Sequence, residues 1–279
     1  MKKILVFIAF LVGVSIENFG IEKVRIGELY YNLDETNKTA EVTGEYREKY
    51  NYSWLKDVEI PASVTYNGST YVVTAIGDET FFWCAHLTTI SIPNTITTIG
   101  YKAFYACDSL VSPIVIPESV TVIETSAFTG CKRIPSITIG QNVTRIGKYA
   151  FEGCRELESI IIPDKVISIG ESAFSTGTRI KSVQIGNNVK RLRAGTFKYC
   201  FELKSIVIGS SVNLIDEDVF YGCDKLSQIT CLALVPPVCT SDVFTSIDKS
   251  ITVFVPAASV ISYTKAEGWK DFDIQPIAK

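Results

Sequence analysis

A phenylalanine recurs through this chain at a nearly constant interval, and that interval limits the fold more than any other feature. Adjacent members of the series are separated by 23, 24, 23, 23, 23, 23 and 24 residues. A fixed period of this length is typical of solenoids, in which one repeat cannot bury its apolar side alone and stacks on the next. The series is Phe81, Phe104, Phe128, Phe151, Phe174, Phe197, Phe220 and Phe244.

Other residues keep the same phase. An aliphatic pattern close to L-x-x-I-x-I follows the phenylalanines and in most repeats ends at proline or glycine, as in Leu157, Ile160, Ile162 and Pro163. The period of two in its last apolar positions predicts a strand with one buried face, and proline stops such a strand because it cannot donate to a ladder. Cysteine lies three residues after most of the phenylalanines: Cys84, Cys107, Cys131, Cys154, Cys200 and Cys223, with Gly177 and Ile247 in this place in two repeats.

The second half of the repeat, V-x-x-I-G-x-x-A-F-x-x-C, is expected to turn the chain back and to send alanine and phenylalanine into the same interior. The sequence therefore predicts a mainly-β repeat solenoid, a stack of about eight 23-residue coils. Their strands should form a parallel ladder at about 4.8 Å per coil. A degenerate ninth coil precedes them at Val58, Ile60 and Pro61.

The start of the chain has the pattern of a signal peptide. Lys2 and Lys3 precede a run of about a dozen apolar residues, which is too short to span a bilayer because a spanning helix needs about 20. We therefore expect residues 1–20 to be a signal peptide and the protein to be exported, to a secreted, periplasmic or cell-surface location. No later stretch is apolar enough to predict a membrane span.

The remaining chain divides into a capped solenoid. Residues 21–56 are expected to form an N-terminal β cap, with strands near 28–33 and 39–43, and residues 57–256 the solenoid. Within the solenoid, Asn67-Gly68 predicts a hairpin insertion over residues 65–73, since Asn-Gly between β-forming residues favours a tight turn. Residues 257–279 are expected to form a C-terminal cap with a short helix, because the open ends of a solenoid need a cover.

These repeats resemble a known family. The unit Ile99-Gly100-Tyr101-Lys102-Ala103-Phe104-Tyr105-Ala106-Cys107-Asp108-Ser109-Leu110 is similar to BspA-like leucine-rich repeats of the exported bacterial type, and the flanks Tyr30-Tyr31 and Val235-Pro236-Pro237 are similar to those of such proteins. The resemblance implies a surface-exposed or secreted binding protein, in some cases an adhesin for host matrix proteins or other microbes. It marks no binding residue, and fold alone does not give a ligand.

Charge and composition argue against several function classes. A net charge of -3 and a pI near 5.4 give no cationic field for nucleic acid. His86 is the single histidine, so a histidine-dependent hydrolase lacks its base. A metal site needs four ligands that converge on one point, and a stack with one phased cysteine in each coil cannot supply them. We expect no enzyme, no cofactor and no catalytic, cofactor-binding or metal-ligating residue. A carboxylate-dependent hydrolase using Asp78 or Asp216 stays as the least favoured alternative. Both residues lie in the segments that turn the chain back before each phased phenylalanine, which we call the returns, and acidic residues there are expected to be solvated.

The phased cysteines are expected to be unreactive buried thiols, because free cysteine packs as a small hydrophobe. Cys231 is expected in the core as well. Cys239 follows two prolines, and a disulfide between Cys231 and Cys239 stays open.

Binding is the favoured function, on two candidate surfaces. The outer face of the strand ladder should carry two rows of small or mixed side chains, and the first coils should carry exposed aromatic residues of the kind enriched at binding hot spots. For the aromatic residues, packing against the N-terminal cap is the alternative. A basic cluster between Arg179 and Lys204 either meets an acidic partner or is neutralised by neighbours. The candidate binding residues are Ser136, Ser159, Ser182 and Ser205 in one row, Thr138, Ile161, Gln184 and Val207 in the next, and the aromatic Phe82, Trp83 and Tyr105.

The sequence thus predicts a nonenzymatic exported protein that mediates protein-protein interaction, with cell-surface adhesion as the role that the resemblance implies. The expected partner is a host or microbial protein or cell-surface ligand. A carbohydrate-binding module that meets a glycan through the early aromatic residues is the alternative. We expect a monomer.

Overall fold

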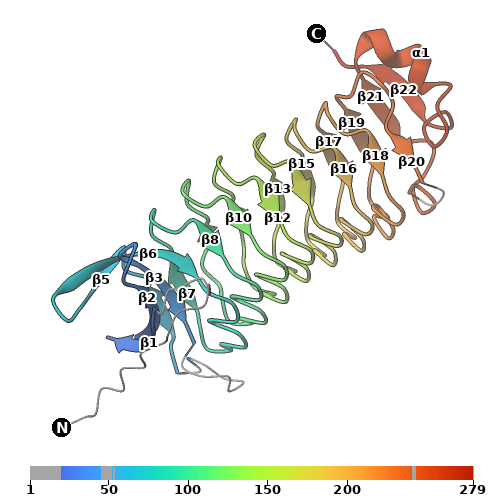
Figure 1. Cartoon of the computed structure of the whole chain (residues 1–279). Coiled ribbons are helices and arrows are strands. Elements are labelled where there is room, and N and C mark those ends of the chain that lie inside the picture. Colours follow the sequence, from blue (N-terminus) through green and yellow to red (C-terminus); the bar gives the residue numbers. More distant parts are fainter. Residues whose placement is uncertain (1–19, 45–51, 53, 241–242, 279) are drawn as a thin grey trace, which may run out of the picture.

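The chain folds into an elongated stack of about nine coils, seen in a computed structural model that describes residues 20–44, 52, 54–240 and 243–278. Figure 1 shows the coils rising in sequence order from the N-terminal end to the C-terminal end. The predicted mainly-β leucine-rich-repeat solenoid is confirmed. The predicted signal peptide falls, except for Gly20, on residues outside the described part. Among the described residues, no helix is long and apolar enough to cross a membrane.

A first parallel ladder runs along the stack, formed by the L-x-x-I-x-I segments. Its outward and inward residues alternate, as in Ser159, Ile160 and Ile161, because successive side chains of a strand point to opposite faces. Its strands are β4 (Asp57–Glu59), β7 (Thr89–Ser91), β9 (Ile114–Val115), β11 (Ile137–Thr138), β13 (Ser159–Ile161), β15 (Ser182–Gln184), β17 (Ser205–Ile208), β19 (Gln228–Cys231) and β21 (Thr252–Val255).

A second parallel ladder, which the sequence did not predict, runs through the segments expected only to turn the chain back. Most of its strands are two residues long, too short to show an alternating pattern. Its strands are β6 (Ser69–Ile76), β8 (Thr98–Ile99), β10 (Val122–Ile123), β12 (Arg145–Ile146), β14 (Ser168–Ile169), β16 (Arg191–Leu192), β18 (Leu214–Ile215) and β20 (Val238–Cys239).

The phased phenylalanines form one continuous stack in the interior. Neighbouring rings are 4.9 to 6.4 Å apart between centroids, and their planes lie within 12° of each other. The backbone of one coil also bonds to the next here, as where the Phe104 N–H donates to the Ala127 carbonyl at 2.7 Å. The phased cysteines lie beside the stack, and the Cys131 thiol donates to the Phe104 carbonyl at 3.0 Å. The returns therefore bury their apolar side chains with their backbone groups paired.

The N-terminal end is covered by β1 (Ile21–Ile26), β2 (Leu29–Asp34) and β3 (Thr39–Thr43), three strands where two were expected. Because β3 pairs in parallel with β6, this small sheet continues directly into the second ladder. β5 (Ser63–Tyr66) pairs antiparallel with β6 in a hairpin that projects from the side of the stack (Figure 1). Its turn is Asn67-Gly68, with φ angles of 48° and 79°, the left-handed conformation that such turns require.

The C-terminal end is covered by a 3₁₀ turn η1 (Ala257–Ser259), a helix α1 (Val260–Tyr263) and a strand β22 (Asp273–Pro276). The helix spans only four residues, since the chain leaves it in turns and reaches a left-handed Gly268 with φ of 84°. The ring of Trp269 meets Phe244, the last ring of the stack, edge-on at 5.1 Å. β22 adds a further parallel strand to the first ladder beside β21, and the Ile277 N–H donates to the Val255 carbonyl at 2.8 Å.

Candidate functional site

The outer side of the first ladder presents the two predicted rows. Strand register places Ser159, Ser182 and Ser205 side by side, and Ile161 beside Gln184 in the second row, while β11 lies next to β13. Most of these side chains are exposed, and Ile161 keeps 61% of its surface accessible. We call this surface the ladder face: Ser136, Thr138, Ser159, Ile161, Ser182, Gln184, Ser205 and Val207.

The ladder face extends beyond the residues that the sequence singled out. Val115 pairs with Thr138 at one end and is 61% exposed, and Thr230 pairs with Val207 at the other. The regular strand spacing was the signal that could have extended the rows in both directions. The surface therefore presents hydroxyl and amide groups with aliphatic side chains between them.

The predicted aromatic residues come together in the first two coils. Phe82 stacks on Tyr105 with centroids 5.1 Å apart and planes at 18°, and Trp83 lies beside Phe82 with 47% of its surface exposed. The Lys102 ammonium, which the sequence did not single out, lies 5.5 Å from the Tyr105 centroid. The N-terminal cap meets the core through a different contact, between the rings of Tyr52 and Phe81 at 5.4 Å. Trp83 is thus exposed to solvent, while Phe82 and Tyr105 are half-buried.

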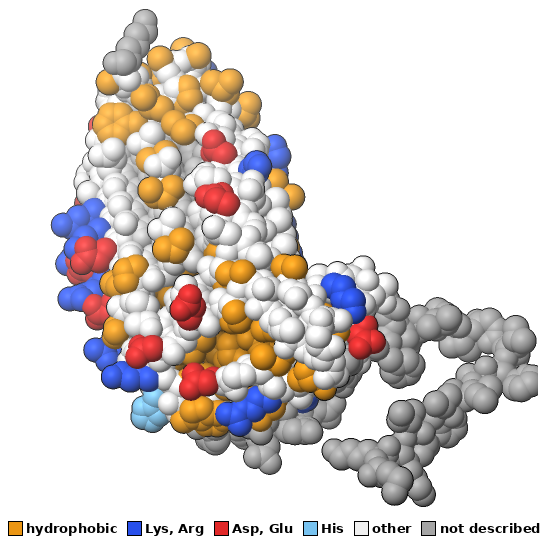
Figure 2. Space-filling view, turned by 90° about the vertical axis from the view of Figure 1, so that its left-hand side faces the viewer, with side chains coloured by type: hydrophobic (Ala, Val, Ile, Leu, Met, Phe, Trp, Pro, Cys, Tyr) orange, Lys and Arg blue, Asp and Glu red, His pale blue; other side chains and the backbone are white. Residues whose placement is uncertain are grey.

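The basic cluster is largely neutralised by carboxylates of neighbouring coils. Lys181 pairs with Glu158 at 3.0 Å, and Arg179 pairs with Glu156 in the same register. Figure 2 shows blue and red side chains next to each other along one edge of the molecule, with hydrophobic side chains spread over the rest of that view. Pairs at successive coils cancel the field that a purely basic strip would produce.

The acidic candidates for catalysis are engaged in structural contacts. Asp216 is 5% exposed and accepts from Arg191 Nε at 2.7 Å. Asp78 Oδ1 accepts from the Tyr101 backbone N–H at 2.7 Å, which ties one return to the next. Asp78 is exposed, as expected, but the expectation of a solvated side chain is wrong for Asp216, which is buried because it pairs with Arg191 of the neighbouring coil.

All the cysteine thiols except that of the half-exposed Cys239 are buried. Burial raises the pKa of Cys84 and of Cys223 to about 12, so both are protonated at neutral pH. Cys231 and Cys239 are both free, and Cys231 Sγ accepts from the Tyr263 hydroxyl at 3.2 Å. Among the described residues, no group of three or more histidine, cysteine or acidic side chains is arranged to hold a metal ion.

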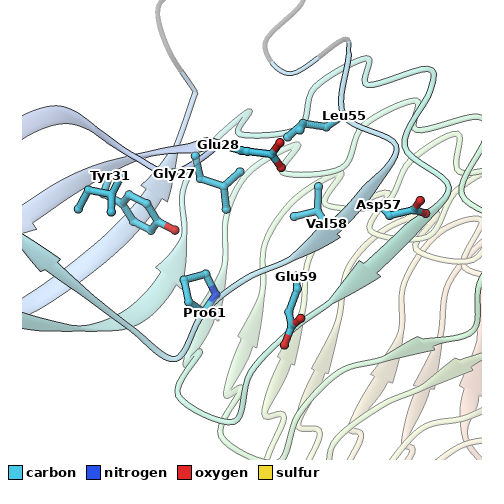
Figure 3. A pocket seen from close by; sticks show the side chains of 10 residues that line it. Gly27, Glu28, Tyr31, Leu55, Asp57, Val58, Glu59 and Pro61 are labelled. Carbon is cyan, nitrogen blue, oxygen red and sulfur yellow. The ribbon is translucent and has the colours of Figure 1, made fainter.

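A hollow of about 350 Å³ at the N-terminal end was not predicted. Figure 3 shows Tyr31 and Pro61 on one side of it and Leu55 and Val58 on the other, with acidic side chains around its edge. Burial raises the pKa of Tyr31 to about 12. The hollow forms where the N-terminal sheet meets β4, so its parts lie far apart in the sequence and no local pattern indicates it.

Several comparisons place the chain among known proteins. The family "BspA type Leucine rich repeat region" matches in six copies, over residues 46–144, 74–192 and 110–227. A leucine-rich repeat protein of Bacteroides ovatus is 28% identical over 91% of this chain and 67% of its own, with a TM-score of 0.69. The leucine-rich repeat protein TpLRR of T. pallidum is 26% identical over 74% of this chain and 91% of its own, with a TM-score of 0.61. No curated protein matches significantly.

The match covers well over half of the sequence and spans most of the stacked phenylalanines and of the two ladders described above. Repeats of this kind form interaction scaffolds. The chain belongs to the BspA-type leucine-rich repeat family.

Proposed function

We propose that this protein is a nonenzymatic, exported interaction scaffold whose ladder face binds a protein partner on a cell surface or in an extracellular matrix. The observation that carries the proposal is the exposure of aligned aliphatic side chains on a rigid ladder. Val115 and Ile161 each keep 61% of their surface in solvent although the same ladder buries its inward residues almost completely. A surface already held in its binding geometry loses little entropy when a partner docks.

The chemistry of the ladder face favours a protein over an anionic ligand. Its rows carry serine, threonine and glutamine beside aliphatic residues and no lysine or arginine. Hydroxyl and amide groups can pair with a partner backbone while the aliphatic side chains are buried, which matches the mixed polar and apolar composition of protein interfaces.

A binding screen with matched variants tests the proposal. The purified chain from residue 21 onward would be measured by biolayer interferometry against extracellular matrix proteins and against the surface proteins of co-resident cells. Ile161→Asp should weaken binding to the partner found by at least about tenfold, a loss of about 1.4 kcal/mol. Ile167→Asp is the control, because Ile167 is in the same coil, is also 61% exposed, and precedes β14 of the second ladder. Equal loss in both variants, or no partner in the whole screen, would overturn the proposal.

Export is tested separately. BspA-type repeat proteins are typically surface proteins, which supports the exported location. We expect the mature N-terminus to fall between Ser15 and Ile21, to be read by terminal sequencing of the protein recovered outside the cytoplasm. Recovery of the uncleaved chain in the cytoplasm alone would contradict it.

A further inference from the structure

The two ladders end differently at the N-terminal end of the stack. The second ladder continues into the N-terminal sheet, because β3 pairs with β6. The first ladder begins at β4, and among the described residues β4 pairs on one side only, with β7. The hollow of about 350 Å³ lies on the other side of β4, between this strand and β2 (Figure 3). The first ladder therefore has an open edge, and the hollow lies beside it.

The backbone groups of β4 alternate between its two sides. The Ile60 N–H donates to the Ser91 carbonyl at 3.1 Å, so the backbone groups of Val58 also face β7. The N–H and C=O groups of Asp57 and Glu59 face the opposite side, because successive residues of a strand direct these groups to opposite edges. No hydrogen bond joins these four groups to another part of the chain that the structure describes. They offer two donors and two acceptors to an added strand.

A buried polar side chain is aimed into the hollow without a partner. Tyr31 lies on β2 and is 1% exposed. Figure 3 shows its hydroxyl directed into the hollow, toward the space between Pro61 and Val58. This hydroxyl forms no hydrogen bond with any residue that the structure describes. Buried polar groups in proteins are rarely left unpaired, because the loss of hydration is then not offset. The Tyr31 hydroxyl therefore points to a ligand that supplies an acceptor.

Carboxylates surround the mouth of the hollow. Glu28, Asp57 and Glu59 are exposed and line it, and its described lining includes no lysine or arginine. The Asp57 carboxylate is held in place, because the Thr88 and Thr89 hydroxyls donate to it at 2.8 and 2.9 Å. These hydrogen bonds also lower the pKa of Asp57, which is therefore charged at neutral pH. The mouth of the hollow favours a basic ligand.

An extended peptide that runs parallel to β4, like the other strands of the ladder, fits these groups. Its central residue would lie opposite Val58, with its N–H donating to the Asp57 carbonyl and its C=O accepting from the Glu59 N–H. Paired residues of neighbouring strands point to the same side of a sheet, so the central side chain enters the hollow beside Val58. The side chains before and after it point outward, beside the carboxylates of Asp57 and Glu59.

The walls of the hollow select the central side chain. Leu55, Val58 and Pro61 are apolar, and the Tyr31 hydroxyl adds one polar group. We propose that the open edge of β4 binds an extended segment of a partner protein with the pattern basic-X-basic, in which X has an apolar body and a polar end. Addition of a strand to an open sheet edge is a known mode of peptide recognition, with the backbone giving affinity and a pocket giving specificity.

This site lies on the edge of the first ladder and does not use the ladder face, so it goes beyond the proposed function. The two surfaces can be tested separately, because Ile161 of the ladder face lies four coils from β4. Ile161→Asp should leave peptide binding at the β4 edge unchanged.

Fluorescence polarisation with labelled nonapeptides tests the proposal on the chain from residue 21 onward. The probe is Ser-Gly-Thr-Lys-Tyr-Lys-Thr-Gly-Ser. One comparison peptide has glutamate for both lysines, and the other has N-methyltyrosine, which lacks the N–H that the Asp57 carbonyl would accept. The probe should bind at least about tenfold more tightly than either. No binding of the probe up to about 1 mM, or equal binding of the probe and the glutamate peptide, would overturn the proposal.

Two substitutions at one position separate charge from backbone. Glu59→Gln keeps the N–H and should weaken probe binding about threefold through the lost charge pair. Glu59→Pro also removes the outward N–H while leaving the bonds to β7, and proline is tolerated where a strand N–H faces solvent. It should weaken binding by a further factor of about five. Glu35→Gln, an exposed residue after β2 that does not line the hollow, is the control and should change nothing. Equal binding by the two Glu59 variants would overturn the proposal.

Tyr31→Phe tests the unpartnered hydroxyl. It should weaken binding of the probe about fivefold, but it should not weaken binding of a peptide with phenylalanine in place of the central tyrosine. The denaturation midpoint should not fall, since the hydroxyl has no partner in the described fold to lose. An equal loss for both peptides with a lower midpoint would show a structural role and overturn the assignment of Tyr31.

The two proposals fail in different ways. Probe binding that falls with Ile161→Asp would overturn the β4 site, while the ladder face keeps its own screen. Light scattering gives the oligomeric state of the parent and of Glu59→Pro. A dimer of the parent that is lost in Glu59→Pro would place a second copy of this chain on the edge and would overturn the peptide proposal.

Discussion

Ile180 fills the space in its coil that a cysteine side chain fills in the coils above and below. The Cδ1 of Ile180 overlaps the position that a Cβ on Gly177 would take. Gly177 stands where Cys154 and Cys200 stand one coil away, and Ile180 where Leu157 and Leu203 stand. The interior keeps its packing because Ile180, an isomer of the leucine in the neighbouring coils, directs its Cδ1 into the space that the missing side chain leaves.

This compensation predicts a coupled pair of substitutions. Gly177→Cys alone should destabilise the fold by about 1 to 3 kcal/mol through overpacking. Ile180→Val alone should cost about 0.5 to 1.5 kcal/mol through loss of a methyl group. The double variant should lie closer to the parent than the sum of the two, because valine lacks the Cδ1 that blocks the cysteine. Urea denaturation of the four proteins measures the coupling, and strict additivity would contradict the account.

Gly100 is predicted to be required by the close approach of two coils. A Cβ at this position would lie 2.7 Å from the Gly77 carbonyl carbon and 2.8 Å from the Asp78 backbone nitrogen. Gly100→Ala should therefore destabilise the fold by about 1 to 3 kcal/mol, since backbone atoms cannot move aside as a flexible side chain can. Tyr101→Ala, at the neighbouring exposed residue, should change stability by about 0.5 kcal/mol or less. A thermal midpoint for Gly100→Ala equal to that of the parent would refute the prediction.

The buried thiols should make the protein sensitive to alkali. The pKa of Cys84 and of Cys223 rises from 9.0 in the unfolded chain to about 12 in the fold. As pH rises, the unfolded state therefore loses the thiol protons before the folded state does. The contribution of each thiol to the free energy of unfolding is complete below about pH 9 and falls as pH rises towards 12. The slope is up to about 1.4 kcal/mol per pH unit for each thiol. Denaturation midpoints between pH 8 and 11 measure the slope, which should become shallower in Cys223→Ala.

Thiol labelling tests the same burial at neutral pH. Burial leaves Cys239 as the half-exposed cysteine among the eight, and the other seven are enclosed. A thiol reagent should modify at most one cysteine in the native protein and all eight after denaturation. Rapid native modification of several phased cysteines would contradict a closed interior.

Trp269 is predicted to hold the C-terminal cap. Its indole Nε1 donates to the Pro237 carbonyl at 2.8 Å, and its ring is fully buried against Phe244. Trp269→Ala should cost about 3 to 5 kcal/mol, and Trp269→Phe should cost less because the ring contact with Phe244 partly survives. Trp54→Ala is the control, since that ring is 55% exposed and removing it should change stability little. Circular dichroism during urea unfolding distinguishes the three variants.

The sequence predicted the stack because its signal is repeated in every coil. The phase of Phe104, Phe128 and Phe151 indicates a common interior regardless of the details of one coil, and strand alternation then places Ser159 and Ile161 outside. The second ladder was missed because a strand such as Val122–Ile123 is too short to alternate. β1 was missed because a register shift between Ile21 and Val24 breaks its pattern.

The candidate sites were predictable to different degrees. The residues of the ladder face can be predicted by identifying the outward positions of one strand and adding the repeat length of 23 to their residue numbers. The hollow beside Tyr31 requires knowing that the N-terminal sheet folds back over β4.

A ladder of nearly identical strands is also a template for polymer growth, because its last strand offers unpaired backbone groups to any further strand. At the C-terminal end β22 limits this. Successive backbone N–H groups of a strand point to opposite edges. The N–H of Ile277 points back to β21, so the backbone nitrogen of the preceding Pro276 faces outward. Because proline has no N–H, this position offers no donor to a further strand. The sheet of the second ladder has its N-terminal edge at β1, and the irregular pairing of β1 with β2 distorts that edge. These two edges therefore resist the addition of a strand from another molecule, which opposes end-to-end growth into fibrils.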